Sequence, residues 1–428
     1  MNVNRRRFLQ RVGGSLSAVG LLASAGCSSS CPDTGRPSPT DTVSLFDETT
    51  GPFETSPSGT WIAPGGNAGH TGHSTHSLPS SPLSVRWRTQ LDVPATEGES
   101  LSASAPTVVD ETVLVADSRR VHALSSRTGE SLWQSEQILV TEHDLDWEEH
   151  AHTVAPSGSS DGSVYVGTVD GIVALDGRDG TARWDESDMT DVATPTIHEG
   201  TVFALGADSL RALDSSGTEL WQRTVNRGNR SVSPAVSNGV VAVPADDGVY
   251  GFDATSGDDL WHFDRRVDTH AVLENGVCYV GNYDGLHAVS ATTGERLWTY
   301  SRGDYRALLS PILTPETIYV VEQPGEAGAA SFALDRTDGE PSPRWCSYIG
   351  SGALTAATDD IALGILSIGE GPNSVEGVVA FAAPLGESLW AIEGGSHPRS
   401  WVTPPAVLDS AIVVTTRGGT VAAVGGAS

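Results

Sequence analysis

The sequence contains no lysine. All 25 basic residues are arginines, and they stand against 54 aspartates and glutamates, which gives a formal net charge of −29 at pH 7. Repulsion among so many carboxylates would destabilise a compact fold at low ionic strength, but at molar salt the Debye length falls to about 3 Å. The composition therefore predicts a halophilic protein, of archaeal type. Such acidity also argues against nucleic acid as a partner.

Cysteine is scarce, with four residues in a chain of 428. Cys27 and Cys31 lie near the N-terminus, whereas Cys278 and Cys346 lie in strand-like segments and are expected to be small buried side chains. No two cysteines are adjacent or have the spacing of a metal-binding pair. The sequence therefore predicts neither a disulfide framework nor a metal site.

Long apolar runs are also missing. The longest, residues 12–25, is too short and too rich in Gly and Ser to span a bilayer, but it suits the apolar part of a signal peptide. Residues 4–10 before it resemble a twin-arginine export signal, and residues 21–27 resemble a lipobox. The residues that carry these resemblances are Arg5, Arg6, Phe8 and Leu9 for export and Cys27 for the lipid. We expect residues 1–26 to be a signal peptide and Cys27 a lipid anchor, with conventional cleavage near Ala25 as the alternative.

Residues 27–60 are rich in Ser, Thr, Pro and Asp and poor in apolar residues. A segment of this composition is expected to be a disordered tether. It would hold a single remaining domain, residues 61–428, on the outer face of the cell membrane. The membrane contact would then be made through the lipid alone.

One pattern is present in many copies: a short strand, a turn with glycine, and a tryptophan on the next strand. Successive tryptophans lie 37 to 51 residues apart, and a period of this size indicates stacked supersecondary units. The eight tryptophans are Trp87, Trp133, Trp184, Trp221, Trp261, Trp298, Trp345 and Trp390. We expect each to be buried between neighbouring units, which removes roughly 150–250 Å² of indole surface from water. A role as a stacking surface for a ligand is the alternative.

Residues 231–261 show how one unit is built. Four short β-rich runs are separated by turns at Asn238-Gly239, Asp247-Gly248 and Ser256-Gly257, and these residue pairs supply the positive φ that tight hairpins require. Each unit is therefore predicted to be a four-stranded antiparallel sheet. A single sheet of this kind cannot bury both faces, so the units are expected to pack radially as the blades of an all-β propeller.

The number of blades follows from the strand openings, of which there are eight between Ser104 and Thr403. Eight blades are therefore predicted, with seven as the alternative. The last opening is followed by only three strands before the chain ends, whereas an unassigned strand ends at Trp87. The N-terminal strand is expected to complete the last blade and close the ring, which removes an exposed edge.

The consensus of the repeats, A-x-D-x-x-T-G-x-x-x-W, resembles the pyrroloquinoline-quinone-type propeller repeat. The resemblance covers about residues 60 to 424, and Trp61 with residues 66–72 resembles the segment that precedes the first blade in such proteins. The resemblance implies an eight-bladed propeller. It implies less about function, because the repeat serves both quinone-dependent dehydrogenases and non-catalytic scaffolds, such as the lipoprotein of the bacterial outer-membrane β-barrel assembly machine.

Residues for catalysis are not evident. Quinone dehydrogenases of this family carry an adjacent pair of cysteines and longer inserted segments, and this chain has neither. His70, His73 and His76 have a regular spacing that would suit metal capture, but they lie in the segment before the first blade and are expected to be structural. We assign no catalytic, cofactor-binding or metal-binding residue, and no cofactor.

The longest departure from the repeat is the connection from Trp133 to Pro156. It contains His143, Asp146, Trp147, His150 and His152, and insertions into repeats commonly carry function. We interpret it as a contact loop for a protein partner at the cell surface; a divalent-metal site and a solvated acidic lip are the alternatives.

The sequence thus favours a non-catalytic, lipid-anchored, extracellular scaffold. A quinone- and calcium-dependent oxidoreductase is one alternative. A module that binds carbohydrate or a small solute in the central funnel is the other.

Overall fold

The computed structural model describes residues 39–79, 81–93, 103–138, 140, 142–144, 151–159, 161–228, 232–267, 269–301, 311–325, 328–337, 339–350, 352–368, 375–382, 387–396 and 400–426. The chain forms two compact units, Met1–Ser30 and Cys31–Ser428, and every described residue belongs to the second. Within the described residues, no helix has the length and apolar character needed to cross a bilayer.

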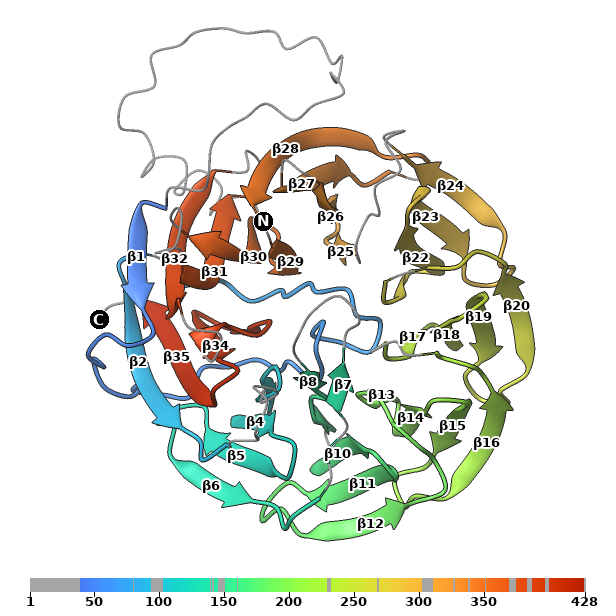
Figure 1. Cartoon of the computed structure of the whole chain (residues 1–428), viewed down its shortest axis with the longest axis horizontal. Helices are drawn as coiled ribbons and strands as arrows, with labels where there is room; N and C mark the ends of the chain where they lie inside the picture. Colours follow the sequence, from blue (N-terminus) through green and yellow to red (C-terminus); the bar gives the residue numbers. More distant parts are fainter. Residues whose placement is uncertain are drawn as a thin grey trace, which may run out of the picture. The chain divides into compact units, whose positions relative to one another are not determined.

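The second unit is an eight-bladed β-propeller, which confirms the predicted fold and blade number (Figure 1). Blade one is β3 (Thr107–Val109), β4 (Thr112–Ala116), β5 (Val121–Ser125) and β6 (Ser131–Gln134). Blade two is β9 (Ser157–Gly158), β10 (Ser163–Thr168), β11 (Gly171–Asp176) and β12 (Ala182–Glu186). Blade three is β13 (Thr196–His198), β14 (Thr201–Leu205), β15 (Ser209–Leu213) and β16 (Glu219–Thr224). Blade four is β17 (Ala235–Ser237), β18 (Val240–Ala245), β19 (Gly248–Asp253) and β20 (Asp259–Phe263).

The second half of the ring repeats this arrangement. Blade five is β21 (Val272–Glu274), β22 (Val277–Asn282), β23 (Gly285–Ser290) and β24 (Arg296–Tyr300). Blade six is β25 (Ile312–Leu313), β26 (Thr317–Gly325), β27 (Gly328–Asp335) and β28 (Ser342–Gly350). Blade seven is β29 (Gly352–Ala357), β30 (Ile361–Ile368), β31 (Val375–Ala382) and β32 (Ser388–Gly395), with β1 (Asp41–Ser44) added outside β32. Blade eight is β33 (Ala406–Leu408), β34 (Ala411–Thr415), β35 (Thr420–Gly426) and β2 (Leu83–Gln90).

In blades one to six the strands are antiparallel and run in chain order from the axis to the perimeter, where β6, β12, β16, β20, β24 and β28 lie (Figure 1); the exceptions elsewhere are β1, which is parallel to β32, and β2, which precedes the other strands of blade eight in the chain. Each of the eight tryptophans lies on the outermost strand of its repeat and pairs across the ladder with a small residue. The partners are Ala423, Ala123, Ala174, Ala212, Gly251, Ala288, Ala333 and Ala380, in the order of the tryptophans. The alanine of the repeat consensus is therefore the residue that leaves room for the indole.

The ring is closed by the N-terminal strand, as predicted. Strand β2 pairs antiparallel with β35, with Val85 opposite Val424 and Trp87 opposite Ala423. All four side chains are buried in one core cluster. The two ends of the propeller sequence are thereby joined by a full ladder, and the last blade has no open outer edge at β35.

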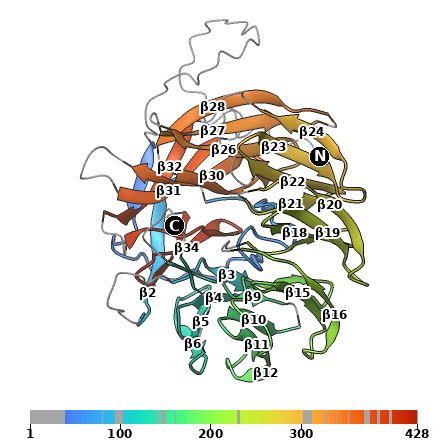
Figure 2. The same ribbon diagram turned by 45° about the vertical axis from the view of Figure 1, so that its right-hand side comes forward.

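The predicted tether is wrong for residues 41–60, while residues 27–38 lie outside the described residues. Strand β1 runs parallel to β32 along its outer side (Figures 1 and 2). Val43 and Leu45 are buried, and the guanidinium of Arg86 lies 5.1 Å from the ring centre of Phe53. The few apolar residues of this segment pack against the propeller. The prediction failed because it was based on the average composition of the segment, which is polar. The folded domain therefore begins before residue 61.

The cysteines also differ in part from expectation. Cys278 is a buried free thiol, and burial raises its pKa to about 12, so it is an inert core side chain. Cys346 is disulfide-bonded. Sequence spacing did not predict this bond.

Replacement of Leu45 by Ala is expected to lower the free energy of unfolding by about 2–5 kcal/mol, because the Leu45 side chain is fully buried. Phe46→Ala is the matched control: Phe46 is 50% exposed, and its loss should change stability by less than about 0.5 kcal/mol. Urea unfolding of both variants at one salt concentration measures the difference. Equal effects would contradict the inclusion of this segment in the folded core.

Candidate functional site

The outer junctions between blades are built around the repeated tryptophans. In five of them the indole N–H donates to a carbonyl oxygen in the last turn of the next blade. These bonds join Trp87 to Ser126 (2.9 Å), Trp133 to Gly177 (2.7 Å), Trp184 to Ser215 (2.9 Å), Trp221 to Ala254 (3.1 Å) and Trp261 to Ala291 (2.6 Å). Each tryptophan is thus both an apolar filler and a directional link to the following blade.

The glycine of the same turn lets the indole approach. A Cβ built on the glycine that faces each of these five tryptophans would lie within 2.8 Å of a tryptophan side-chain atom. The five glycines are Gly129, Gly180, Gly217, Gly257 and Gly294, and all have φ between 71° and 84°. Glycine is therefore required in this turn for two reasons: the backbone is left-handed, and a side chain would collide with the indole.

The other three tryptophans are held by side-chain packing, of the kind that Trp184 and Trp221 also make with Tyr165 and Phe203. Trp298 packs on Tyr279 with ring centres 5.9 Å apart, and Trp345 packs on Tyr319 at 6.1 Å. Trp390 is 2% exposed within the core that includes blade eight. A Cβ added to Gly339, in the last turn of blade six, would have no atom within 4 Å. This glycine therefore does not contact Trp298, whereas the five turn glycines named above each contact a tryptophan.

Replacement of Trp221 by Ala is expected to cost about 3–5 kcal/mol of unfolding free energy, since the indole is 6% exposed and bonded to the next blade. The neighbouring Leu220 is 52% exposed on the same strand, so Leu220→Ala should be nearly neutral. Chemical denaturation distinguishes the two. A cost under about 1 kcal/mol for Trp221→Ala would refute its role between the blades.

The inner junctions use hydroxyl groups. Thr107 donates to the carbonyl oxygen of Pro156 (3.0 Å), Ser157 to that of Pro195 (2.6 Å) and Thr196 to that of Pro234 (2.7 Å). In each case the first strand of one blade bonds to the proline that opens the next blade. The prolines that mark the strand openings in the sequence thus lie at the contacts nearest the axis.

The segment Ser58–Ser77, which we call the axial segment, passes through the middle of the ring and bonds to every blade (Figure 1). Its partners in blades one to eight are Val108, Gly158, Thr196, Val236, Leu273, Leu313, Ala357 and the pair Asp409 and Ser410. Seven of these eight blades are held by backbone hydrogen bonds of 2.7–3.2 Å, and blade three is held by the His70 ring on the Thr196 hydroxyl at 3.4 Å. The innermost strands are sheet edges, and the axial segment satisfies some of their inward-facing groups.

Close backbone approach fixes the sequence of the axial segment. A Cβ on Gly69 would lie 2.2 Å from the carbonyl oxygen of Leu273, so this position admits only glycine. Asn67 organises the turn, because its side-chain oxygen accepts from the Gly69 N–H (3.1 Å) and its amide donates to the Thr71 hydroxyl. The resemblance of residues 66–72 to a pre-blade segment therefore has a physical basis.

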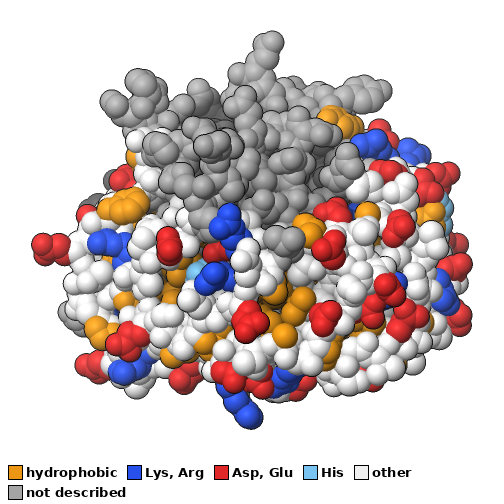
Figure 3. All heavy atoms as spheres, turned by 60° about the horizontal axis from the view of Figure 1, so that its bottom comes forward, with side chains coloured by type: hydrophobic (Ala, Val, Ile, Leu, Met, Phe, Trp, Pro, Cys, Tyr) orange, Lys and Arg blue, Asp and Glu red, His pale blue; other side chains and the backbone are white. Residues whose placement is uncertain are grey.

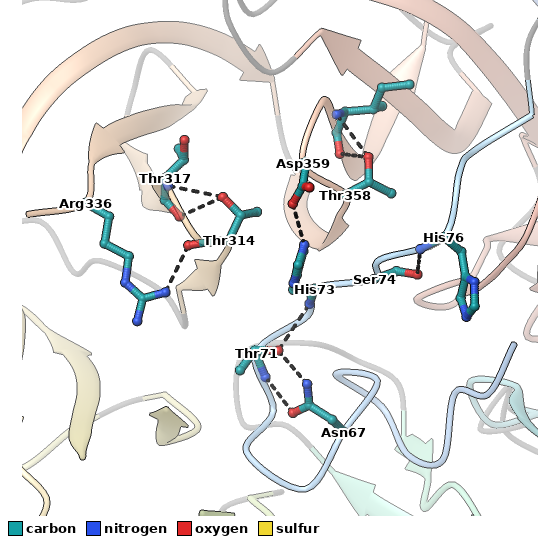
Figure 4. A network of polar contacts seen from close by, with 11 residues as sticks. Asn67, Thr71, His73, Ser74, His76, Thr314, Thr317, Arg336, Thr358 and Asp359 are labelled. Carbon is teal, nitrogen blue, oxygen red and sulfur yellow. Dashed lines mark hydrogen bonds and ion pairs between the residues drawn. The ribbon is translucent and has the colours of Figure 1, made fainter. Parts of the chain in front are cut away.

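His73 and His76 of the axial segment point in different directions (Figure 4), and His70 contacts other residues than His73 does. His73 Nε2 lies 2.9 Å from a carboxylate oxygen of Asp359 in blade seven. His70 lies edge-on to His270, with ring centres 6.2 Å apart. Burial, and then the neighbouring His270, lower the pKa of His70 to about 3, so the ring is neutral near pH 7. Within the described residues, no group of three or more His, Cys, Asp or Glu side chains is arranged to hold a metal ion.

The blade-to-blade connections and the second-to-third-strand turns share one rim, which we call the connection rim. The insertion after Trp133 rises from it: Ile138 bonds to Arg119 in the β4–β5 turn, and Val140 bridges Thr168 at the end of β10. The insertion then forms a separate hairpin of β7 (Glu142–Asp144) and β8 (Ala151–Thr153), in which His143 pairs with His152. Of this hairpin only the backbone is described.

The remaining candidates in that loop, Asp146, Trp147 and His150, lie outside the described residues, as do Arg5, Arg6, Phe8, Leu9 and Cys27. The structure therefore shows where the loop leaves the ring. The contact role of its side chains remains a prediction.

One residue of the connection rim was not noticed in the sequence. The side chain of Arg227, between blades three and four, is fully buried; its guanidinium donates to the carbonyl oxygens of Gly206 (3.3 Å) and Asp191 (2.6 Å) and to the Asp191 carboxylate (2.6 Å). Desolvation lowers the pKa of Arg227, and Asp191 opposes this. The buried Arg227 thereby links the connection after β12 and the connection after β16 to the β14–β15 turn. No local pattern in the sequence predicts this contact.

This ring, with its tryptophan junctions and its axial segment, defines a propeller of the quinone-repeat class. Residues 118–342 match the family model described as outer membrane protein assembly factor BamB, and the chain belongs to that family. No curated protein matches the sequence significantly.

Solved structures share the fold at low sequence identity. BamB from Moraxella catarrhalis is similar with a TM-score of 0.59 and 16% identity, over 80% of this chain and 99% of that one. The quinohemoprotein alcohol dehydrogenase ADHIIG from Pseudomonas putida HK5 is similar with a TM-score of 0.58 and 14% identity, over 86% of this chain and 80% of that one. Sqt1 from Saccharomyces cerevisiae has a TM-score of 0.57 and 11% identity, over 81% of this chain and 99% of that one.

Proposed function

We propose that this protein is a non-catalytic scaffold on the outer face of the cell membrane, exported by the twin-arginine route and anchored by a lipid on Cys27. The observation that supports a scaffold most directly is the axial segment, because its hydrogen bonds at the centre of the ring tie all eight blades together, seven through its backbone and blade three through the His70 ring. A ring held in this way is a rigid platform. Membership of the assembly-factor family supports the same role.

The enzymatic alternative has less support. Quinohemoprotein alcohol dehydrogenases share the fold, but likeness at 14% identity carries no reaction with it. The paired cysteines expected in quinone dehydrogenases are missing from the sequence. The central-funnel alternative is disfavoured by the axial segment, which lies where the innermost strands face the axis.

Two observations support export. The disulfide at Cys346 suits an oxidising compartment, because such bonds are rare in reducing ones. The visible face in Figure 3 carries many acidic side chains and fewer basic ones, which suits contact with a salt-rich medium. Together with the N-terminal signal pattern, they favour a location outside the membrane.

The hairpin of the connection rim is the proposed partner contact. Replacement of residues 145–150 by a short Gly-containing turn should keep the ring folded and reduce crosslinking to partner proteins in intact cells at least about five-fold, equivalent to about 1 kcal/mol. The control is Asp110→Ser with Glu111→Ser, which removes two exposed charges from the opposite rim. Unchanged crosslinking in the hairpin variant would remove the loop from the interface.

The anchor is tested by Cys27→Ser, with Ser28→Ala as the control. We expect the Cys27 variant to lose its lipid label and to move from the membrane fraction to the medium. The reason is that the lipid on Cys27 is the membrane attachment that we propose. Arg5→Lys with Arg6→Lys should instead retain the precursor inside the cell. Membrane retention of the unlipidated Cys27 variant would show that another contact anchors the protein.

A further inference from the structure

Cys346 lies at the perimeter of the ring. It is on β28, the outermost strand of blade six, where it stands opposite Phe332 of β27. Its side chain is half-buried and packs against the core cluster that blades five and six share. Cys346 is disulfide-bonded, whereas Cys278 is a free and buried thiol. The bond is therefore made on the outer side of blade six, where another segment of the chain can reach it.

The number of cysteines restricts the partner. The chain has four of them, Cys27, Cys31, Cys278 and Cys346. Since Cys278 is free, a bond within the chain joins Cys346 to Cys27 or to Cys31. The two choices differ in their consequence for the proposed anchor. A cysteine that carries a lipid has its sulfur in a thioether and no thiol to oxidise, so a disulfide at Cys27 and a lipid at Cys27 exclude each other.

The described part of the N-terminal segment begins close to this blade. Strand β1 lies outside β32 of blade seven, with Asp41 opposite Trp390. The Thr40 N–H and the Thr40 hydroxyl both donate to a carbonyl oxygen of β32, so the chain is already attached to the perimeter at residue 40. Blades six and seven are neighbours and share a core cluster. The segment is thus first seen one blade away from the bonded Cys346.

The length of the chain allows the bond. Cys31 precedes Asp41 by ten positions. An extended chain spans about 3.3–3.6 Å per residue, so these two residues can lie up to about 35 Å apart. Sheets that pack face to face are about 10 Å apart, which makes this reach sufficient to pass from blade seven to blade six.

We propose that Cys346 is bonded to Cys31, and that this bond fixes the chain beside the lipid to the outer side of blade six. The assignment rests on the proposed lipid anchor, which uses the sulfur of Cys27. When the bond forms, the two thiols are oxidised and the disulfide of an extracellular carrier protein is reduced to two thiols, which take up the two protons. This exchange requires an oxidising compartment, in agreement with the proposed export.

The bond has a consequence for the membrane-facing side of the ring. Without it, the first described attachment is Thr40, and the thirteen positions after Cys27 allow a separation of about 45 Å. With it, four positions separate Cys27 from the bonded Cys31, which limits their separation to about 14 Å. The outer side of blade six would then be held beside the lipid surface. Blade two, across the ring from blade six, would be remote from it (Figure 1).

The bond is tested by peptide mapping of the full-length protein, denatured and alkylated without reduction. Wild-type protein should give a crosslinked peptide that contains Cys31 and Cys346, and Cys278 should be alkylated. Cys27→Ser should keep this crosslink, whereas Cys31→Ser should abolish it and leave Cys346 alkylated. Cys278→Ala is the matched control, because it removes a cysteine that is outside the bond, and it should leave the crosslink unchanged.

The outcomes separate the bond from the anchor. A crosslinked peptide that contains Cys27 in place of Cys31 would overturn the assignment and the lipid anchor together. Alkylation of Cys346 in wild-type protein that still carries its lipid would overturn the bond and leave the anchor standing.

The orientation is tested with the lipidated protein in phosphatidylglycerol vesicles that contain a photoreactive phospholipid, and labelled peptides are mapped by mass spectrometry. Wild-type protein should be labelled at least five-fold more on β28 of blade six than on β12 of blade two. Cys31→Ser keeps the lipid but lacks the bond, so this ratio should fall at least two-fold. Equal labelling of β28 and β12 in wild-type protein with an intact crosslink would overturn the proposed placement of blade six at the membrane.

Discussion

Hydrogen bonds from one segment of about twenty residues connect all the blades of this ring, seven of them through the backbone of the segment and blade three through the His70 ring. Each blade presents its innermost strand to the axis as a sheet edge, and eight such edges meet there. The axial segment forms hydrogen bonds with backbone groups on these edges. It can pass so close to the inner strands because glycines stand where the two backbones approach most closely. Blades that otherwise contact only their two neighbours thereby acquire a common partner.

The perimeter is held by a second and independent device. A tryptophan on the outer strand, an alanine or glycine opposite it, and a glycine in the turn of the next blade form one contact, repeated around much of the ring. The large side chain fits because the two small ones leave room, so the three consensus positions depend on each other. Where the turn of the next blade is longer, as after Trp298, no glycine of that turn covers the indole, and the tryptophan packs on Tyr279 of its own blade.

Charge adds a constraint of another kind. The acidic surface repels itself and is compatible with the fold only when salt screens it or when buried pairs fix particular residues. Arg227 shows the buried case, with its guanidinium satisfied by two carbonyls and a carboxylate.

The repeat in the sequence determined the fold class, the eight blades, the positions of the tryptophans and the closing partnership of β2 with β35, because each depends on patterns within or between adjacent units. Only the tertiary structure decided the rest. The strand β1 and the axial segment carry few apolar residues, and they are held by backbone contacts to strands distant in the sequence together with a few buried side chains such as Val43 and Trp61. The burial of Arg227 likewise arises where separate connections and a turn meet, and no local pattern encodes such a meeting.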